Sequence, residues 1–200
     1  GPALVIDTSC SSGLVAMDYA IKGLQAGDCE SALVGAANLF FAPGKGIVGD
    51  VENDDFLVRT FDDKAAGTVW GEGVASFLLK TVAQAEKDGD AIYGIIKGIA
   101  VNNDGASNGI TAPNARAQQD VLLKAWEKAG ISPEEISYIE SHGTGTNLGD
   151  PIEIRGLSNA VAKHTQRKQF CGIGSVKTNI GHTVATAGLA SLSKVLLSLK

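Results

Sequence analysis

Along almost the whole chain, short apolar segments alternate with segments in which apolar residues recur at the spacing of a helix, and glycine-containing turns separate them. Residues 3–7 and 31–37 have the apolar content of buried strands, and the second is small enough in its side chains to pack on both faces. Residues 10–26 have the spacing of an amphipathic helix that stops at Gly27. The same order continues with strands predicted at 73–80, 92–101, 136–140 and 171–176, and with helices predicted at 117–129, from Asp150 onward and from about 184 to the end. This alternation predicts an α/β fold with layered sheets.

Polar segments separate these elements. Residues 38–72 form a long loop region with glycines at 44, 46, 49, 67 and 71, and a loop of this length is usually functional. Residues 102–116 form a second polar loop, and residues 87–90 form a polar turn. Ser132 and Pro133 are the residue types of a helix start, with serine as the cap and proline at the first position.

Composition excludes several classes of function. The chain has 200 residues and a formal net charge of −5, which argues against non-specific binding to nucleic acid or to an anionic membrane surface. It contains no apolar run of 18 residues and no signal-peptide pattern. The three cysteines have no metal-type spacing, so we expect no disulfide framework, no bound metal and a reducing, cytoplasmic compartment.

The two ends of the chain lack the features of a domain boundary. Gly1-Pro2 leads straight into an apolar segment, and Leu199-Lys200 lies in the middle of a predicted helix without a stop signal. We therefore expect the chain to be an internal fragment of a longer protein.

Cys10 is placed between a predicted strand and a predicted helix, in Asp7-Thr8-Ser9-Cys10-Ser11-Ser12-Gly13. Unpaired N–H groups and a partial positive charge at a helix N-terminus stabilise a thiolate and can receive a developing oxyanion. Cys29 and Cys171 have no such setting. This pattern favours Cys10 as a nucleophile, and the alternative is an unreactive cysteine of the core.

Two histidines follow predicted strand ends in similar turns. His142 lies in Glu140-Ser141-His142-Gly143-Thr144-Gly145-Thr146, and His182 closes Lys177-Thr178-Asn179-Ile180-Gly181-His182. Sites in α/β proteins are built at strand ends. Two histidines in matching turns, together with Cys10 in a third, indicate a reactive site, although a lone histidine is more often structural.

Strand–turn–helix order occurs at both ends of the chain, at 3–26 and at 171–199. The apolar spacing of Leu14, Met17, Ile21 and Leu24 is repeated by Leu189, Leu192, Leu196 and Leu199. One turn contains Cys10 and the other contains His182. A duplicated α/β unit explains this repeat, although amphipathic helices in general share the spacing.

At these residues the chain resembles the β-ketoacyl synthase (ketosynthase) domains of the thiolase superfamily. The resemblance rests on the cysteine motif at 7–12, on the histidine motif at 142–146 with Gly149-Asp150-Pro151-Ile152-Glu153, and on the second histidine motif at 177–182. Phe61-Asp62, Gly71-Glu72-Gly73 and the segments 102–105 and 107–114 also match family signatures. The threonine-containing histidine motif is similar to that of modular type I polyketide synthases. The chain departs from the family at Thr183-Val184, because an acidic residue commonly follows the second histidine there.

The resemblance implies a thiolase-like fold of αβαβα layers built from a duplicated unit and incomplete in this fragment. It further implies a partial ketosynthase domain over 1–200. Residues 1–90, approximately, would be the end of an N-terminal half with the active-site cysteine. Residues 91–200, approximately, would be the start of a C-terminal half with both histidines.

The resemblance also implies the chemistry. Cys10 would take an acyl group from an acyl carrier protein as a thioester, and a malonyl-type extender on carrier phosphopantetheine would lose CO₂ and attack that thioester. His142 and His182 would each donate a hydrogen bond to the extender's thioester oxygen as negative charge develops. The chain would then be an acyltransferase of the β-ketoacyl synthase type in polyketide biosynthesis, with no directly bound cofactor.

Three further residues have supporting roles in this interpretation. Lys177 would order the second histidine turn, unless it is a surface lysine. Thr144 and Thr146 would bind the pantetheine amides, unless they only form the turn. The segment Asp150-Pro151-Ile152-Glu153 has the pattern of a helix cap, and for it we favour a structural role.

Other functions stay open at this point. A thiolase would share the fold, but its second reactive group is typically a cysteine where this chain has His182. A non-elongating ketosynthase passes acyl chains on without condensation, and a catalytically silent subunit only shapes a partner's pocket. The family is usually dimeric, so we expect a homodimer of the parent enzyme, with acyl carrier protein and acyl and malonyl-type thioesters as partners.

Overall fold

The computed structural model describes residues 1–40, 51–107 and 112–199. Gly44, Gly46 and Gly49 of the long loop, and part of the signature at 107–114, lie outside the described residues. The chain forms two compact units. The described residues of Gly1–Pro43, Gly71–Ile96 and Thr183–Lys200 form the first unit, and those of Gly44–Trp70 and Lys97–His182 form the second.

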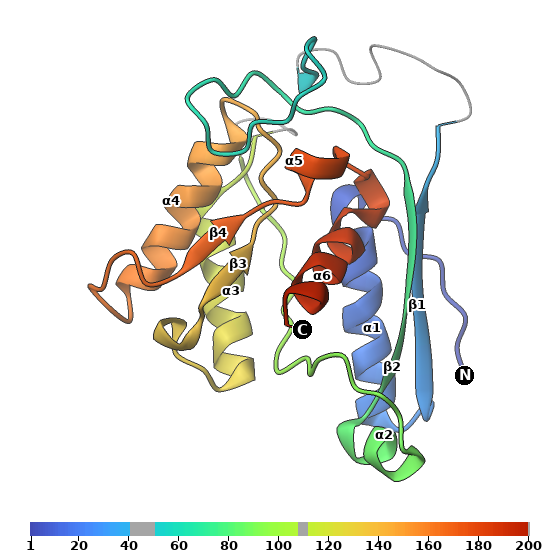
Figure 1. The fold of residues 1–200 in the computed structure, drawn as a ribbon. Coiled ribbons are helices and arrows are strands. Elements are labelled where there is room, and N and C mark those ends of the chain that lie inside the picture. The colour runs from blue at the N-terminus through green and yellow to red at the C-terminus, as the bar shows by residue number, and fades with distance from the viewer. Residues whose placement is uncertain (41–50, 108–111, 200) are drawn as a thin grey trace. The chain divides into compact units, whose positions relative to one another are not determined.

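The first unit is built on an antiparallel strand pair (Figure 1). β1 (Ser31–Asn38) pairs with β2 (Gly73–Lys80), with Leu33 opposite Leu78. The helices α1 (Ser12–Ala26), α2 (Val82–Asp88) and α6 (Ala187–Ser198) belong to the same unit, with the 3₁₀ helices η1 (Ser9–Ser11) and η4 (Val184–Thr186). α1 packs against β1 and also against α6. The buried side chains of Met17, Leu24, Val34 and Leu189 form the core of this unit.

Two glycines permit the close approach of α1 and α6. A Cβ atom on Gly13 would lie 2.8 Å from Cγ of Leu189, and one on Gly188 would lie 2.5 Å from Cγ of Leu14. Any larger residue at either position would therefore push the two helices apart. Cys10 lies in η1, which leads directly into α1.

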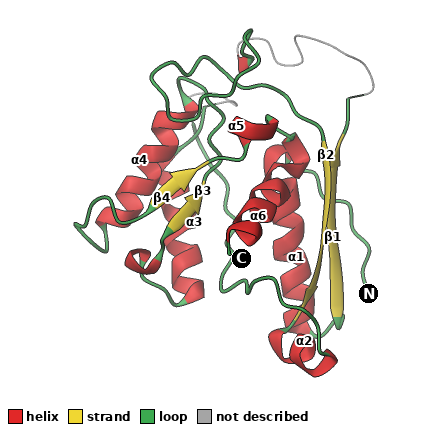
Figure 2. Cartoon of the chain, in the orientation of Figure 1, coloured by secondary structure: helices red, strands yellow, loops and turns green. Residues whose placement is uncertain are grey.

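The second unit contains a short parallel strand pair and two longer helices (Figure 2). β3 (Tyr138–Glu140) pairs with β4 (Gly172–Gly174), and α3 (Ala115–Ala129) packs against α4 (Gly149–Ala162). The 3₁₀ helix η3 (Pro133–Glu135) precedes β3, and the four-residue helix α5 (Lys177–Ile180) follows β4. Among the described residues, every helix is too short or too polar to cross a bilayer.

Elements with strong local signals match their predictions. The helix predicted at 10–26 begins with η1, continues as α1 and ends at Gly27, which has the left-handed conformation (φ 79°). α3 likewise ends at a left-handed residue, Gly130. At η3, Ser132 and Glu135 form a reciprocal capping box. The helix predicted from Asp150 begins at Gly149, and the final helix has 3₁₀ geometry in its first turn.

The strands predicted at 3–7 and 92–101 are wrong. Neither segment is a strand, and most of their apolar side chains are exposed, including Leu4, Val5, Ile92 and Ile95. A strand needs a neighbour for its backbone hydrogen bonds, and no described residue pairs with either segment. The strands predicted at 136–140 and 171–176 are shortened to three residues each.

Two smaller expectations also fail. β1 is buried on one face only among the described residues, since Leu33 is 75% exposed, so it does not pack on both faces. The polar turn predicted at 87–90 is the end of the short helix α2. The Thr81 side chain caps the start of this helix, and Gly89 ends it in the left-handed conformation.

Candidate active site

Cys10 lies in the first unit, in the turn of η1 that leads into α1. The preceding residue, Ser9, has a positive φ of 57°, which is unusual for a residue with a side chain. Side chains hold this turn: the Asp7 carboxylate accepts a hydrogen bond from the Ser9 N–H at 3.0 Å, and the Ser12 hydroxyl donates to the Ser9 carbonyl at 2.7 Å. The half-buried Cys10 thiol is therefore presented on a sharp, locally braced turn.

His142 lies in the second unit, two residues after β3. The Glu153 side chain, on α4, holds the backbone of the turn that contains His142. One carboxylate oxygen accepts a hydrogen bond from the His142 N–H at 2.7 Å, and the other accepts from the Gly143 N–H at 2.8 Å. Gly143 has a φ of 42°, and a Cβ there would collide with Thr60 and Ser175, so the turn requires glycine.

Asp150 lies three residues before Glu153 in α4 and also holds the loop that contains His142. Its two carboxylate oxygens accept hydrogen bonds from the N–H groups of Gly145 and Phe61, at 3.0 and 2.7 Å. The predicted helix cap is therefore wrong in its details. The residue at the cap of α4 is Leu148, which has no side-chain cap bond, and the Asp150 and Glu153 carboxylates instead fix the histidine turn.

Lys177 is a buried lysine, with 2% of its surface exposed, and not a surface residue. Its ammonium group donates a hydrogen bond to the His142 backbone carbonyl at 2.6 Å and lies 3.4 Å from His142 Nδ1. We expected Lys177 to order the second histidine turn, but its side chain contacts the first one. An ammonium group is a donor only, so the lone pair of Nδ1 faces it and the proton of a neutral His142 is placed on Nε2.

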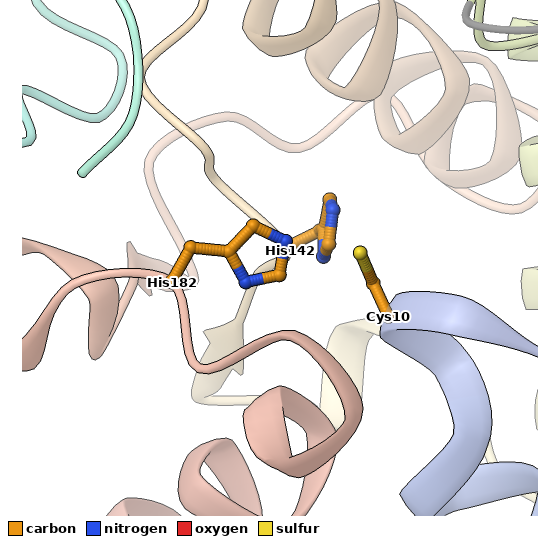
Figure 3. Close-up of side chains that lie close together, drawn as sticks. All are labelled: Cys10, His142 and His182. Carbon is orange, nitrogen blue, oxygen red and sulfur yellow. The ribbon is translucent and has the colours of Figure 1, made fainter. Parts of the chain in front are cut away.

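His182 follows α5 and is buried. Its N–H donates a hydrogen bond to the Val69 carbonyl at 2.7 Å. The ring centroids of His182 and His142 lie 5.3 Å apart with the rings at 88°, and the Trp70 ring lies 5.5 Å from His182. Figure 3 shows the two imidazoles, and it also draws the side chain of Cys10, which belongs to the first unit.

Both histidines are poor proton acceptors in this setting. Burial, the charge of Lys177 and the neighbouring His182 lower the pKa of His142 to about 3. His142 is partly open to solvent, but the protein atoms around its ring still reduce the hydration of the imidazole. Burial and the charge of Lys177 lower the pKa of His182 to about 4. Both imidazoles are therefore neutral near pH 7, and each has one N–H to donate.

The hydroxyl groups of Thr144 and Thr146 lie 3.1 Å apart, within hydrogen-bond distance. The Thr146 hydroxyl also accepts a hydrogen bond from the Gly149 N–H at 3.1 Å. These contacts account for a role in forming the turn. Binding of pantetheine amides by the two threonines stays a prediction.

Sequence reasoning missed two kinds of residue at this site. Glu153 and Asp150 lie three apart on α4, and that spacing places both carboxylates on one helix face, so their joint role could have been recognised. Trp70 contacts the His182 ring, and Glu52 accepts a hydrogen bond from Trp70, but no sequence pattern connects either residue with His182. Two imidazoles are fewer than the three or four protein ligands of a zinc site, so the histidine pair does not make one by itself.

Comparison with known protein families agrees with the motifs. Residues 1–85 match the N-terminal domain of beta-ketoacyl synthases, and residues 93–200 match the C-terminal domain. The chain belongs to the β-ketoacyl synthase family. The resemblance that the cysteine and histidine motifs indicated is thereby confirmed.

Individual relatives of this β-ketoacyl synthase chain are polyketide synthases. It is 50% identical over 203 residues to polyketide synthase PksM of Bacillus subtilis, covering 100% of this chain and 5% of that protein. It is 43% identical over 203 residues to polyketide synthase ThaG of Burkholderia thailandensis, covering 100% of this chain and 4% of that protein. The chain thus spans a small part of the length of these relatives.

A solved structure confirms the fold class. The ketosynthase from module 6 of the bacillaene synthase of Bacillus subtilis 168 matches with a TM-score of 0.95 and 48% identity, over 98% of this chain and 36% of that chain. The chain therefore has an α/β fold of the thiolase-like ketosynthase type and spans about a third of that solved ketosynthase.

Proposed function

We propose that this chain carries the reactive residues of a ketosynthase that performs decarboxylative Claisen condensation in polyketide biosynthesis. The observation that carries the proposal is the pair of neutral imidazoles, His142 and His182, with ring centroids 5.3 Å apart. Two pre-oriented N–H donors suit an oxygen that gains negative charge during reaction, and each such donor can contribute roughly 3 kcal/mol.

In the first half-reaction Cys10 is the acceptor. Its thiolate attacks the carbonyl carbon of an acyl thioester on the phosphopantetheine of an acyl carrier protein. The new bond is the Cys10 thioester, the bond that breaks joins the acyl carbon to the pantetheine sulfur, and the carrier leaves as its thiol. The braced turn around Ser9 and Cys10 supports this role because it holds the thiol at the start of α1.

In the second half-reaction a malonyl-type extender arrives on a carrier protein. Its carboxylate leaves as CO₂, and the electron pair of that bond forms an enolate. His142 and His182 each donate a hydrogen bond to the enolate oxygen, which was the thioester oxygen of the extender. The enolate carbon then attacks the Cys10 thioester, and the cysteine sulfur leaves as the thiolate.

Lys177 supports this step in two ways. Its hydrogen bond to the His142 carbonyl fixes the turn, and its charge next to Nδ1 keeps the proton of His142 on Nε2. Lys177 is thus a positioning residue in the proposed reaction. A directly bound cofactor has no role in it, since the pantetheine arrives with the carrier protein.

We propose the same division of the chain as its motifs imply. Residues 1–90, approximately, would contribute the acceptor cysteine from an N-terminal half, and residues 91–200, approximately, would contribute both histidines from a C-terminal half. In the parent enzyme we expect a homodimer.

The test is intact-mass analysis of the full-length protein after incubation with a short acyl thioester, with Cys10→Ala as the control. A single acyl adduct that is lost in the control supports Cys10 as the acceptor. An adduct without condensation after addition of a malonyl thioester would indicate a non-elongating ketosynthase. A folded protein without any adduct would overturn the proposal in favour of a silent, pocket-shaping subunit.

A further inference from the structure

Trp70 of the second unit lies beside His182, and Glu52 of the same unit contacts Trp70. The ring centroids of Trp70 and His182 are 5.5 Å apart, with the rings tilted by 32°. The indole N–H of Trp70 donates a hydrogen bond to a carboxylate oxygen of Glu52 at 2.6 Å. The indole is therefore held at one end by a carboxylate and contacts the imidazole with its ring.

Backbone pairing fixes where this indole lies. Trp70 and His182 form an isolated parallel bridge, and the His182 N–H donates to the Val69 carbonyl. A second bridge joins Glu52 to Thr68, whose N–H donates to the Val51 carbonyl at 2.7 Å. Glu52, Trp70 and His182 are thus tied to one another through the main chain as well as through their side chains.

Gly67 allows the crossing that this arrangement needs. It has a φ of 136°, and a Cβ there would lie 2.7 Å from the Val51 carbonyl oxygen and 2.9 Å from the carbonyl carbon of Glu52. Only glycine lets the segment at 51–52 pass so close to the strand-like segment that leads to Trp70. The position of Glu52 is therefore set by the fold of this unit.

We propose that Trp70 and Glu52 are positioning residues for His182: the carboxylate holds the indole, and the indole holds the imidazole in one orientation between itself and His142. Rotation about the Cβ–Cγ bond of a histidine has a broad energy profile, so packing must select the ring orientation. The His142 ring approaches His182 edge-on at 88°, and the Trp70 ring approaches it at 32°, so the imidazole has an aromatic contact with each.

The inference deepens the proposed function and rests on it, because an oriented donor matters only if His182 stabilises the developing oxyanion. Misplacement of a reacting group by about 1 Å can lower a rate by roughly 100-fold. Loss of the indole should therefore reduce the decarboxylation and condensation steps. It should leave the acylation of Cys10 unchanged, since that step does not use the extender's oxyanion donors.

The test compares variants of the full-length protein. Trp70→Ala should lower the rate of malonyl-thioester decarboxylation by roughly 10- to 100-fold. Trp70→Phe keeps a ring but loses the donor, so its rate should fall less. Glu52→Gln retains an acceptor oxygen and should be nearly wild type, whereas Glu52→Leu should resemble Trp70→Phe. The double variant Trp70→Phe with Glu52→Leu should be no slower than Trp70→Phe alone, because the two residues act through one hydrogen bond.

NMR of the His182 ring provides a readout that does not require activity. In Trp70→Ala the imidazole of His182 gains hydration, so the pKa of His182 should rise from about 4 toward its usual value. Its charged and titratable neighbours, Lys177 and His142, are unchanged in this variant. Trp126→Phe alters the other tryptophan of the chain and should leave the His182 resonances unchanged.

The outcomes separate the two proposals. Unchanged His182 resonances and pKa in Trp70→Ala would overturn the positioning role, whatever the activity. A wild-type protein that neither decarboxylates nor condenses would defeat the proposed function, while the NMR result would still decide whether Trp70 positions His182. Additive losses in the double variant would show that Glu52 does not act through the indole.

Discussion

The ammonium nitrogen of Lys177 lies 2.6 Å from the backbone carbonyl oxygen of His142, although 35 residues separate the two in sequence. This contact joins the segment after β4 to the turn after β3 and places a buried positive charge next to the imidazole. It explains why a lysine can be buried here, since its ammonium group has a carbonyl acceptor within its own unit.

Replacement of Lys177 by methionine should remove this charge and its hydrogen bond. The pKa values of His142 and His182 should both rise, because the charge of Lys177 lowers each of them. Loss of a buried hydrogen-bond donor should also cost about 1–3 kcal/mol of stability. NMR titration of the ring protons and thermal unfolding measure the two effects. Lys163→Met, at an exposed lysine, is the matched control and should change neither.

Glu153→Gln should loosen the turn that carries His142. The glutamate accepts from two backbone N–H groups, and the amide retains only one acceptor oxygen, so one of these N–H groups loses its partner. We expect a loss of about 1–3 kcal/mol in unfolding free energy, together with slower decarboxylation. Glu127→Gln, at an exposed glutamate of α3, should behave as wild type. If both variants have the same stability and activity, Glu153 does not hold the turn.

Stability should decrease as the pH falls through the range set by His182. Its folded pKa of about 4 lies below the ordinary value of 6.5, so the unfolded chain takes up the proton first and is favoured at acid pH. The loss should accumulate between pH 6.5 and about 4 and amount to about 3 kcal/mol at most. Glu153 acts in the opposite sense, because burial raises its pKa and protonation relieves the buried charge.

Thermal unfolding at a series of pH values tests this expectation. His182→Gln should have a shallower dependence on pH than the wild type over the same range. Parallel curves for the two proteins would contradict the lowered pKa of His182.

Gly13→Ala should destabilise the first unit. The new methyl group would lie 2.8 Å from Cγ of Leu189, which is fully buried, and 3.2 Å from the Ala185 carbonyl oxygen. Overpacking of this kind costs about 1–3 kcal/mol. Gly23→Ala in the same helix is the comparison, because its methyl group would meet only the Cys29 sulfur at 3.8 Å. Gly23→Ala should gain roughly 0.5–1 kcal/mol of stability from helix propensity. The packing argument would be contradicted if Gly23→Ala melted at a lower temperature than Gly13→Ala.

Local sequence patterns were sufficient to predict much of the fold and to indicate the proposed reactive residues. Helical spacing with Gly27 and Gly130 as stops predicted α1 and α3, since a left-handed glycine ends a helix through contacts within its last turn. The motifs around Cys10, His142 and His182 indicated the family, because the residue types of these turns are recognisable without their surroundings.

Contacts between distant segments decided the rest. Whether residues 3–7 and 92–101 become strands depends on a partner strand, and hydrophobicity cannot supply one. The roles of Lys177, Glu153 and Trp70 likewise follow from where the chain places a carbonyl, two N–H groups and an imidazole. Helix ends are satisfied within a few residues, whereas a buried charge or ring finds its partner only when the chain has folded around it.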